Sequence, residues 1–249
     1  MLSSGELTRY DRQIMIPGLG REGQEKLKAA RVFVAGAGGL GSPVSIYLAA
    51  SGVGSLRIAD HDRVELSNLN RQVLHWEEDL QRQKVLSAHQ KLRKLNRHVE
   101  VETVDQTISG ENVLDLVRGC DAIVDAMDNL PTRYILNKAA LDQGIPFFHG
   151  AVRAFEGRAM SVVPGESACL RCLYRGPVAQ EKFPVIGMTP AVIGSIQATE
   201  VVKYIVGVGA LLLNRLLIYD GLRMKFTEFT VKKNPRCDHC GEATERIQR

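Results

Sequence analysis

The chain has 249 residues, with 32 Lys and Arg against 28 Asp and Glu, and a formal net charge of +4. Hydrophobic residues make up 45% and charged residues 24%, which excludes a disordered tail, a collagen-like fibre and a disulfide-stapled miniprotein and favours a globular protein with a full core. A charge of +4 over this length makes no electrostatic footprint by itself, so no nucleic-acid partner is expected.

Neither an export signal nor a membrane span is visible in the sequence. The N-terminus lacks the basic and apolar regions of a signal peptide. The most apolar run, Tyr204 to Leu213, is shorter than the roughly 18–20 residues that cross a bilayer. We therefore expect a cytoplasmic protein with no membrane partner.

The first part of the chain alternates short apolar runs with helical segments. Residues 1–30 are polar and helix-prone and form a predicted N-terminal arm. Predicted strands follow at 31–35, 55–60, 99–104, 122–126 and 146–150, and predicted helices at 42–51, 84–95, 111–118 and 132–143. This alternation predicts an α/β fold with a Rossmann-like, mainly parallel sheet flanked by helices.

The pattern changes after residue 150. Val152 to Val163, with Gly157 in the middle, is typical of an antiparallel hairpin. A loop is predicted at 176–189, a helix at 193–204, and strands at 216–220 and 225–231. We expect these elements to extend the same sheet, so that residues 1–249 form a single domain. Its nucleotide-binding half would be 31–150 and its antiparallel half 151–249.

The segment from Gly36 to Gly41 fits the pattern G-x-G-x-x-G between a predicted strand and a predicted helix. Its first glycine permits a tight turn, Gly38 lets the backbone approach a phosphate, and the last lets the helix pack on the strand. Asp60 lies 19 residues after Gly41, at the end of the next strand, where a carboxylate accepts hydrogen bonds from ribose hydroxyls. The sequence therefore predicts a nucleotide site.

Charged residues near this site favour a triphosphate with a divalent metal. Arg71 belongs to a polar run, Ser67 to Gln72, and Lys84 opens a predicted helix. Asp128 follows a buried strand, at the edge where open α/β sheets bind ligands. Arginine and lysine neutralise phosphate oxygens, and aspartate can hold Mg²⁺. Nicotinamide chemistry needs neither, although an NAD-dependent oxidoreductase stays an alternative, and each charge taken alone can be a solvated surface group.

Four of the five cysteines form two Cys-x-x-Cys pairs: Cys169 with Cys172, and Cys237 with Cys240. In a reducing compartment this spacing indicates metal binding or redox chemistry before it indicates structural disulfides. Cys120, the fifth, precedes a predicted strand, where a small buried residue is expected.

These motifs, together with Arg9-Tyr10-x-Arg12-Gln13 and Asp125 to Asn129, resemble the MoeB/ThiF/HesA family of ubiquitin-activating-enzyme-like adenylyltransferases. The resemblance covers nearly the whole chain. It implies that ATP adenylates the C-terminal glycine of a small ubiquitin-like sulfur carrier protein ending in Gly-Gly, with release of pyrophosphate. It also implies a homodimer, in which Arg12 reaches the triphosphate bound by the neighbouring subunit.

The resemblance carries roles onto individual residues. Asp60 would bind the ribose, and Asn68, Arg71 and Lys84 the phosphates. Asp128 would bind magnesium. The predicted catalytic residues are Arg12, Arg71, Lys84 and Asp128, and the remaining nucleotide-binding residues are Gly36, Gly38, Gly39 and Gly41. The zinc ligands would be Cys169, Cys172, Cys237 and Cys240, in a closed structural site with no position for a substrate.

Several relatives carry a reactive cysteine in the loop over the adenylation site, and residues 176–189 of this chain contain none. We therefore expect no covalent link between enzyme and carrier through a cysteine of this chain, and a separate sulfur donor. The pathway stays open among thiamine, molybdopterin or tungstopterin, and amino-acid biosynthesis. A related enzyme that activates a carboxylate on tRNA and a non-catalytic adaptor are further alternatives.

Several single residues and one helix also lead to predictions. Arg133 is expected on a helix surface, with contact to the carrier's tail as the alternative. His75 and Trp76 are expected to pack around the phosphate-binding segment. His239 is expected to be a spectator between two cysteines. The helix at 193–204 is expected to be buried with one polar edge.

Overall fold

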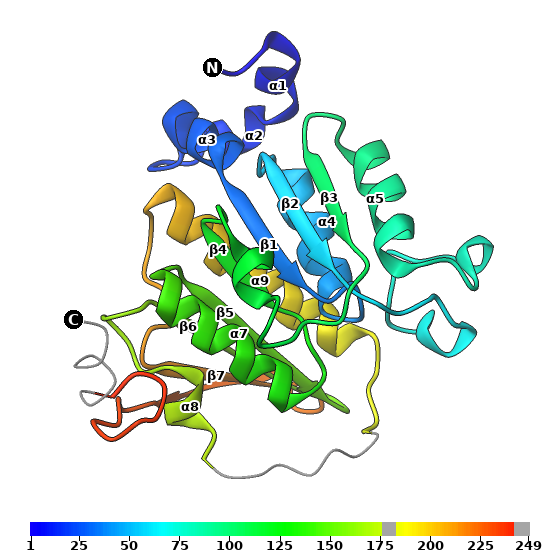
Figure 1. Ribbon diagram of the computed structural model, residues 1–249. Helices are drawn as coiled ribbons and strands as arrows, with labels where there is room; N and C mark the ends of the chain where they lie inside the picture. The colour runs from blue at the N-terminus through cyan, green and yellow to red at the C-terminus, as the bar shows by residue number, and fades with distance from the viewer. Residues whose placement is uncertain (176–182, 242–249) are drawn as a thin grey trace.

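The computed structural model describes residues 1–175 and 183–241 (Figure 1). Within them, eight strands form one sheet in the order β3-β2-β1-β4-β5-β6-β7-β8. The strands are β1 Arg31–Ala35, β2 Ser55–Ala59, β3 Glu100–Val104, β4 Ala122–Asp125, β5 Phe147–Arg153, β6 Glu156–Val162, β7 Arg215–Asp220 and β8 Lys225–Thr230. The first five pair in parallel and the last three antiparallel, which confirms the predicted fold class.

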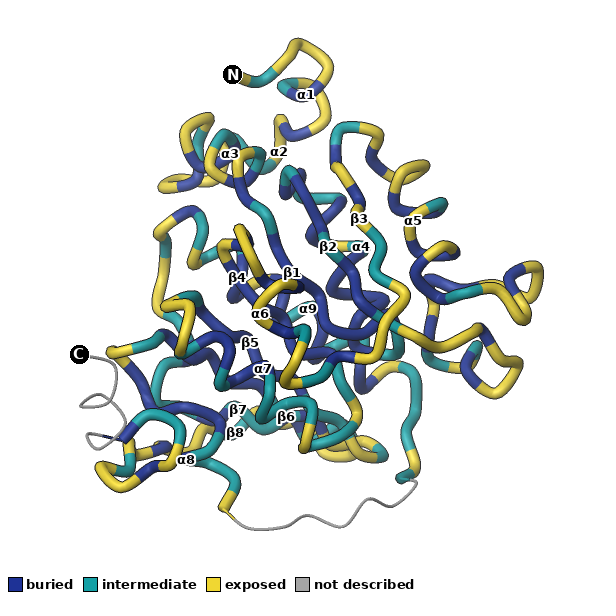
Figure 2. Tube along the Cα trace, in the orientation of Figure 1, coloured by how far each residue is buried: buried dark blue, intermediate teal, exposed yellow. Residues whose placement is uncertain are grey.

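Helices cover both faces of the sheet. One apolar cluster joins the sheet to α3, α4, α5 and α9, and a second joins its other face to α6, α7 and α8. The helices are α1 Ser4–Arg9, α2 Asp11–Ile14, α3 Gly20–Ala29, α4 Gly41–Ser51, α5 Lys84–Leu95, α6 Val113–Val117, α7 Leu130–Gln143, α8 Leu170–Leu173 and α9 Met188–Val206, with short 3-10 turns η1 Leu66–Asn68 and η2 Glu77–Asp79. Figure 2 shows the central strands and α4 mostly buried.

Local signals in the sequence explain where the helices of the parallel half begin and end. The helix α4 ends at Gly52, which adopts a left-handed conformation with φ of +83°. The side chain of Asn129 caps α7 by accepting a hydrogen bond from the amide of Thr132, and Pro131 stands in the first turn. These signals bring α4 and α7 close to their predicted ranges.

The hairpin after residue 150 differs from its prediction. Its turn lies at Ala154 and Phe155, and Gly157 pairs with Val152 inside the ladder. A methyl group at Gly157 would lie 2.3 Å from the side chain of Ile193 on α9. The glycine therefore serves close packing of a helix on the strand, not the turn, and β5 runs on as one strand from Phe147.

The helix α9 begins at Met188, five residues earlier than predicted, because Pro190 is tolerated in its first turn. Part of the predicted 176–189 loop is thus helical, and residues 176–182 lie outside the described part of the chain. No helix among the described residues is long and apolar enough to cross a membrane.

Candidate functional site

The glycine loop, residues 36–41, connects β1 to α4 at the carboxyl edge of the parallel strands. Gly36 has φ of +103°, and a methyl group there would lie 2.8 Å from the carbonyl oxygen of Ala126. A methyl group at Gly41 would lie 1.9 Å from the carbonyl oxygen of Gly36. Both positions exclude a side chain, so the loop forms the tight turn and the close helix–strand contact that its pattern predicts.

Asp60 follows β2 and contacts this loop directly. Its Oδ2 atom accepts a hydrogen bond of 2.8 Å from the amide of Ala37, and its Oδ1 atom accepts one of 2.8 Å from the amide of Asp62. Each carboxylate oxygen has a further lone pair, so Asp60 can still accept hydrogen bonds from ribose hydroxyls. The structure thus brings Asp60 to the loop, as the order of strands predicts.

The segment 66–72 lies against the same loop. Arg71 Nη1 donates to the carbonyl oxygen of Ser67 at 2.8 Å, and a methyl group at Gly39 would lie 3.6 Å from Arg71 Cγ. Gln72 is 5% exposed, and its amide lies 3.5 Å from where a methyl group on Gly38 would be. Its Oε1 atom is buried and has no hydrogen-bond partner among the residues that the structure describes. Gln72 is therefore a candidate binding residue that sequence reasoning missed.

The start of α9 completes this edge of the site. A methyl group at Gly187 would lie 2.4 Å from the carbonyl oxygen of Asn70, and one at Gly39 would lie 3.5 Å from Pro190. Segments near residues 39, 70 and 190 therefore meet, although they are far apart in the sequence.

Lys84 and Asn68 are already engaged within the chain. Lys84 is buried, and its Nζ atom lies 2.7 Å from Asp62 Oδ2. Asn68 is buried too, and its Oδ1 atom accepts a hydrogen bond of 3.2 Å from the amide of Glu65. Lys84 must therefore exchange Asp62 for phosphate oxygens if it binds a nucleotide.

Asp128 lies on the loop between β4 and α7, two residues after Ala126, which contacts Gly36. It is exposed, and Asn129 Nδ2 donates to its Oδ1 atom at 3.4 Å. No ion pair holds it within residues 1–175 and 183–241. A single free carboxylate beside a phosphate site is a donor set that suits Mg²⁺, which keeps waters and takes further ligands from substrate phosphates.

Arg12 lies at the opposite edge of the sheet. Neighbours of Arg12 contact the far ends of two helices that start at the site: Gln13 donates to the carbonyl oxygen of Ser51, and Arg9 to that of Leu95. A helix of the length of α4 spans about 16 Å. That is longer than an arginine side chain, so Arg12 cannot reach the glycine loop of its own chain.

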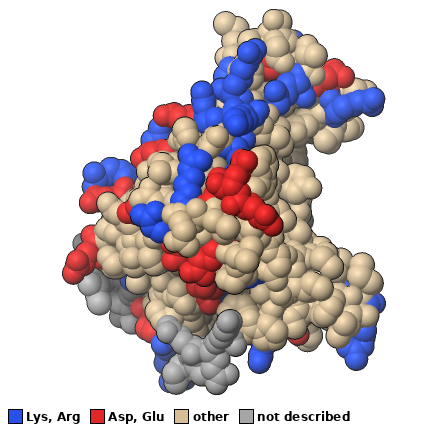
Figure 3. All heavy atoms as spheres, turned by 90° about the vertical axis from the view of Figure 1, so that its right-hand side faces the viewer, with Lys and Arg blue, Asp and Glu red and all other residues tan. Residues whose placement is uncertain are grey.

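The face that carries α5 shows how charge is distributed around Arg12. In Figure 3, Lys and Arg gather toward the end of the molecule where α1 lies, and acidic side chains lie below them. Arg9, Arg12 and the basic last turn of α5 are exposed at this end.

Asp125 ends β4 as a fully buried carboxylate, and sequence reasoning missed the partners that hold it. His149 Nδ1 lies 2.7 Å from Asp125 Oδ2, and Arg133 Nε lies 3.4 Å from the same atom. Arg133 also donates to the carbonyl oxygens of Met127 and Gly150. Its side chain is 11% exposed, so the expectation of a helix-surface arginine is wrong.

Burial lowers the pKa of His149, and the adjacent Asp125 opposes this effect. The imidazole is therefore neutral, with its Nδ1–H donating to Asp125. The two residues are direct partners in the β4–β5 register, at the ends of neighbouring apolar runs. That register is the signal by which the pair could have been found.

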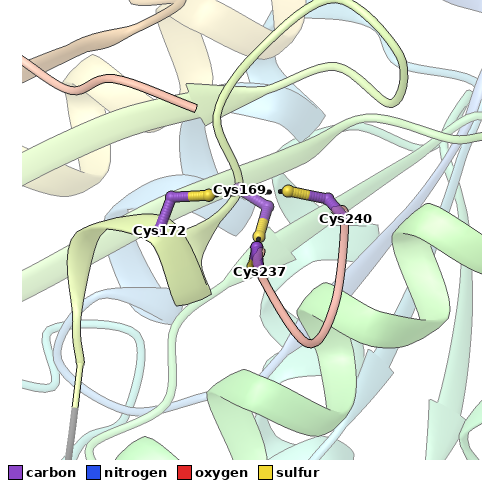
Figure 4. A group of neighbouring side chains, drawn as sticks. All are labelled: Cys169, Cys172, Cys237 and Cys240. Atoms are coloured by element: carbon purple, nitrogen blue, oxygen red, sulfur yellow. Dashed lines mark hydrogen bonds between the residues drawn. The ribbon is translucent and has the colours of Figure 1, made fainter. Parts of the chain in front are cut away.

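The four paired cysteines converge to form a sulfur cluster, Cys169, Cys172, Cys237 and Cys240 (Figure 4). Their Sγ atoms all lie within 4.8 Å of one another, with Cys169–Cys237 at 3.7 Å and Cys172–Cys240 at 3.5 Å. These separations are too long for disulfides. Zn–S bonds of about 2.3 Å in a tetrahedron place the sulfurs about 3.8 Å apart, so the cluster fits zinc.

The four thiols also shift one another's pKa values. The thiol of Cys240 and nearby amides donate to Cys169 and lower its pKa to about 5. The resulting thiolate raises the pKa of Cys240, and burial raises that of Cys237 to about 11. Four thiolates this close repel one another, and a divalent cation removes that repulsion.

Two further predictions concern residues near the cysteines. His239 is held by Asn137, whose Nδ2 atom lies 2.8 Å from His239 Nδ1, and it does not join the sulfur cluster. Cys120 is buried, and burial raises the pKa of its thiol to about 11, so it is an unreactive packing residue.

Comparison with known proteins places this geometry in context. Residues 10–239 match the model of the ThiF family. The chain is 45% identical to "Sulfur carrier protein adenylyltransferase" of Thermus thermophilus, over 97% of this chain and 93% of the relative. It is 44% identical to "SAMP-activating enzyme E1" of Haloferax volcanii, over 97% of this chain and 91% of the relative.

Solved structures give the same result for the fold. The crystal structure of E. coli MccB with ATP matches with a TM-score of 0.86 at 26% identity. The match covers 96% of this chain and 75% of that chain.

Proposed function

Because the chain belongs to the ThiF family and is an adenylyltransferase, we propose that it adenylates the C-terminal glycine of a ubiquitin-like sulfur carrier protein ending in Gly-Gly. ATP supplies the adenylyl group, and pyrophosphate leaves. The family resemblance expected from the sequence is confirmed by the match over residues 10–239. The substrate is inferred from the relatives' names.

One observation carries the proposal. The glycine loop, Asp60, Arg71 with Gln72, and the start of α9 pack against one another at the carboxyl edge of the parallel strands. Ligands of open α/β sheets bind at that edge. The loop has no room for side chains at Gly36 and Gly41, and a buried acceptor of Gln72 lacks a partner. A nucleotide supplies hydroxyl and amino donors of the kind that this acceptor needs.

Roles follow for the residues at this edge. Asp60 accepts hydrogen bonds from the ribose, and Arg71, Lys84 and Asn68 hold the phosphates. The glycine loop contributes its backbone through Gly36, Gly38, Gly39 and Gly41. Asp128 holds Mg²⁺, which when bound offsets negative charge on the phosphates.

The chemistry needs positioning and positive charge more than a nucleophilic side chain. A carboxylate oxygen of the carrier bonds to the α-phosphorus, the bond from that phosphorus to the bridging oxygen breaks, and pyrophosphate leaves with the electron pair. Both partners are anions, so Arg71 and Lys84 offset repulsion and developing charge. Holding both reactants in one site supplies a further part of the rate.

The proposed assembly is a homodimer with shared sites. Arg12 is exposed at the edge opposite its own glycine loop, so it acts in the partner's site. The sulfur cluster holds zinc as a structural ion. Residues 176–189 contain no cysteine, which leaves sulfur delivery to a separate donor. The cysteines of the described residues form no disulfides, which favours a cytoplasmic reaction.

ATP–pyrophosphate exchange tests the proposal. Purified protein is mixed with one candidate carrier at a time and radiolabelled pyrophosphate, and label in ATP is counted. We expect exchange with one carrier and none with the same carrier lacking its last glycine. Arg71→Ala should abolish exchange, whereas Arg118→Ala, an exposed arginine at the amino edge of β4, should not.

The same protein is titrated with NAD to test the alternative of an oxidoreductase. Exchange that persists after removal of the terminal glycine contradicts the proposed acceptor. Absence of exchange with every carrier, together with micromolar NAD binding, favours the oxidoreductase.

A further inference from the structure

His75 lies beneath the glycine loop and joins it to α5. It is 3% exposed, although imidazole is polar. Its Nε2 atom lies 2.8 Å from the carbonyl oxygen of Ala37, and its Nδ1 atom lies 2.8 Å from Ser87 Oγ. Both ring nitrogens therefore have partners, one on the loop and one on the helix.

The partners determine the direction of each hydrogen bond. A carbonyl oxygen only accepts, so His75 Nε2 must carry a hydrogen and donate to Ala37. Burial lowers the pKa of His75, so the ring is neutral and Nδ1 accepts from the Ser87 hydroxyl. Lys91 Nζ donates to Ser87 Oγ at 3.0 Å and pairs with Asp79, whose carboxylate Ser87 also contacts, so Ser87 links His75 to a buried ion pair.

Ala37 is consequently held from both sides. Its amide donates to Asp60, the proposed ribose-binding residue, and its carbonyl accepts from His75. In a trans peptide the C=O and the following N–H point in opposite directions. Holding the Ala37 carbonyl toward His75 therefore aims the Gly38 amide away from it, on the side where a phosphate approaches the loop. Within the described residues, the Gly38 amide has no acceptor.

We propose that His75 is a positioning residue for nucleotide binding: it orients the Ala37–Gly38 peptide so that the Gly38 amide and Asp60 face the nucleotide together. The ligand's identity as ATP rests on the proposed function. The residue does not touch the nucleotide, since its ring nitrogens are both occupied by the protein.

Two amide substitutions test the two ring nitrogens of His75 separately. Glutamine places its amide nitrogen where Nε2 stands and can still donate to Ala37, whereas asparagine reaches only the position of Nδ1. We expect His75→Asn to weaken ATP binding about tenfold, the effect of one lost buried hydrogen bond, and His75→Gln to stay within about twofold of wild type. His89→Asn, on the exposed side of α5, is the matched control.

The readouts are calorimetric ATP binding, KM for ATP and for the carrier, and the thermal midpoint. A positioning role predicts that His75→Asn raises the KM for ATP and leaves the KM for the carrier unchanged. His75→Gln should have a KM for ATP close to that of wild type. Equal ATP affinity in both variants at a lowered thermal midpoint would overturn the proposal and make His75 a packing residue. Equal weakening in both would overturn it too.

A measurement on protein with His75 intact tests the proposal even if the His75 variants fail to fold. Nitrogen NMR of histidine-labelled protein should show the Nε2–H tautomer for His75 both in wild type and in Ser87→Ala, because the Ala37 carbonyl needs that hydrogen in both; the Nδ1–H tautomer in wild type would overturn the proposal. Wild-type protein that binds ATP but adenylates no carrier overturns only the proposed function. Wild-type protein that binds no ATP overturns both.

Discussion

At the glycine-loop edge of the sheet, the protein's own groups bind one another. Ala37 donates to Asp60, His75 donates to Ala37, and Lys84 pairs with Asp62. In the sulfur cluster, by contrast, the sulfur atoms lie within 4.8 Å of one another. The first region is held by complementary donors and acceptors, and the second gathers four groups of one kind.

This difference separates two uses of a ligand. The nucleotide edge can fold before its ligand arrives, because Ala37, Asp60 and Lys84 have partners within the chain, and the ligand then exchanges some of these partners. The sulfur cluster brings together groups that repel one another once ionised, so we predict that its stability depends on the proposed zinc ion. Removing each ligand should therefore affect activity in the first region and folding in the second.

The largest expected effect comes from the sulfur cluster. Cys172→Ser should lose the proposed zinc and destabilise the protein by about 4 kcal/mol or more, because that ion would join α8 to residues 237–240. Zinc per chain is measured by atomic absorption and unfolding free energy by urea titration. Cys120→Ala should keep its zinc and cost about 1 kcal/mol. A full zinc content in Cys172→Ser would contradict the prediction that the sulfur cluster depends on its ion for stability.

The second largest expected effect is on activity, with no change in stability. Asp128→Ala should lower pyrophosphate exchange about 1,000-fold, or about 4 kcal/mol in activation free energy, because Mg²⁺ loses its protein ligand. Zinc content and the urea midpoint should stay at wild-type values. Loss of zinc in this variant would show that the two regions are not independent.

Mixing two inactive variants tests whether the two subunits of the proposed dimer share each site. Arg12→Ala and Asp128→Ala, each inactive alone, should recover on the order of a quarter of wild-type exchange when mixed equally, because half of the dimers then hold one intact site of two. Exchange is assayed after heterodimers have been demonstrated by mass. Heterodimers without activity would contradict the shared site.

The smallest effect is a pH dependence of stability. Burial lowers the pKa of His75 and of His149, so between their folded values and about 6.5 the unfolded chain binds more protons. The unfolding free energy should therefore fall as pH drops below about 6.5. Urea titrations near pH 7.5, 6.5 and 5.5 measure this slope.

The pH slope has matched controls. Replacing one buried titrating group by His75→Gln should make the slope shallower, and the exposed His89→Asn should not change it. The carboxylate of Glu6, whose pKa Lys28 and Ser3 lower to about 2 against burial, loses its contribution only below about pH 4.5, outside this range.

Sequence patterns located the parallel half well because its signals are local. Short apolar runs delimit β1 and β4, and Gly52 marks the end of α4. The antiparallel hairpin was predicted, but its turn was not, because the position of Gly157 is decided by Ile193, which packs on it from α9. Only the folded sheet brings these two residues together.

The same distinction holds for the candidate site. Contact between Asp60 and the glycine loop could be expected, since neighbouring parallel strands end at one edge. The Asp62 partner of Lys84, the contact of Arg133 with Asp125 and, among the described residues, the unpaired acceptor of Gln72 could not be expected, because each depends on side-chain packing. The roles of the predicted site residues stay predictions that the variants above test.

The sulfur cluster also sets an order of events during synthesis. Cys169 and Cys172 are made first, and 64 residues separate Cys172 from Cys237. All strands of the parallel half, and the glycine loop with them, precede the first pair and can fold as the ribosome delivers them. The proposed metal site would close only when residue 240 has emerged, so for a zinc-binding chain metal supply would act after the nucleotide edge has folded.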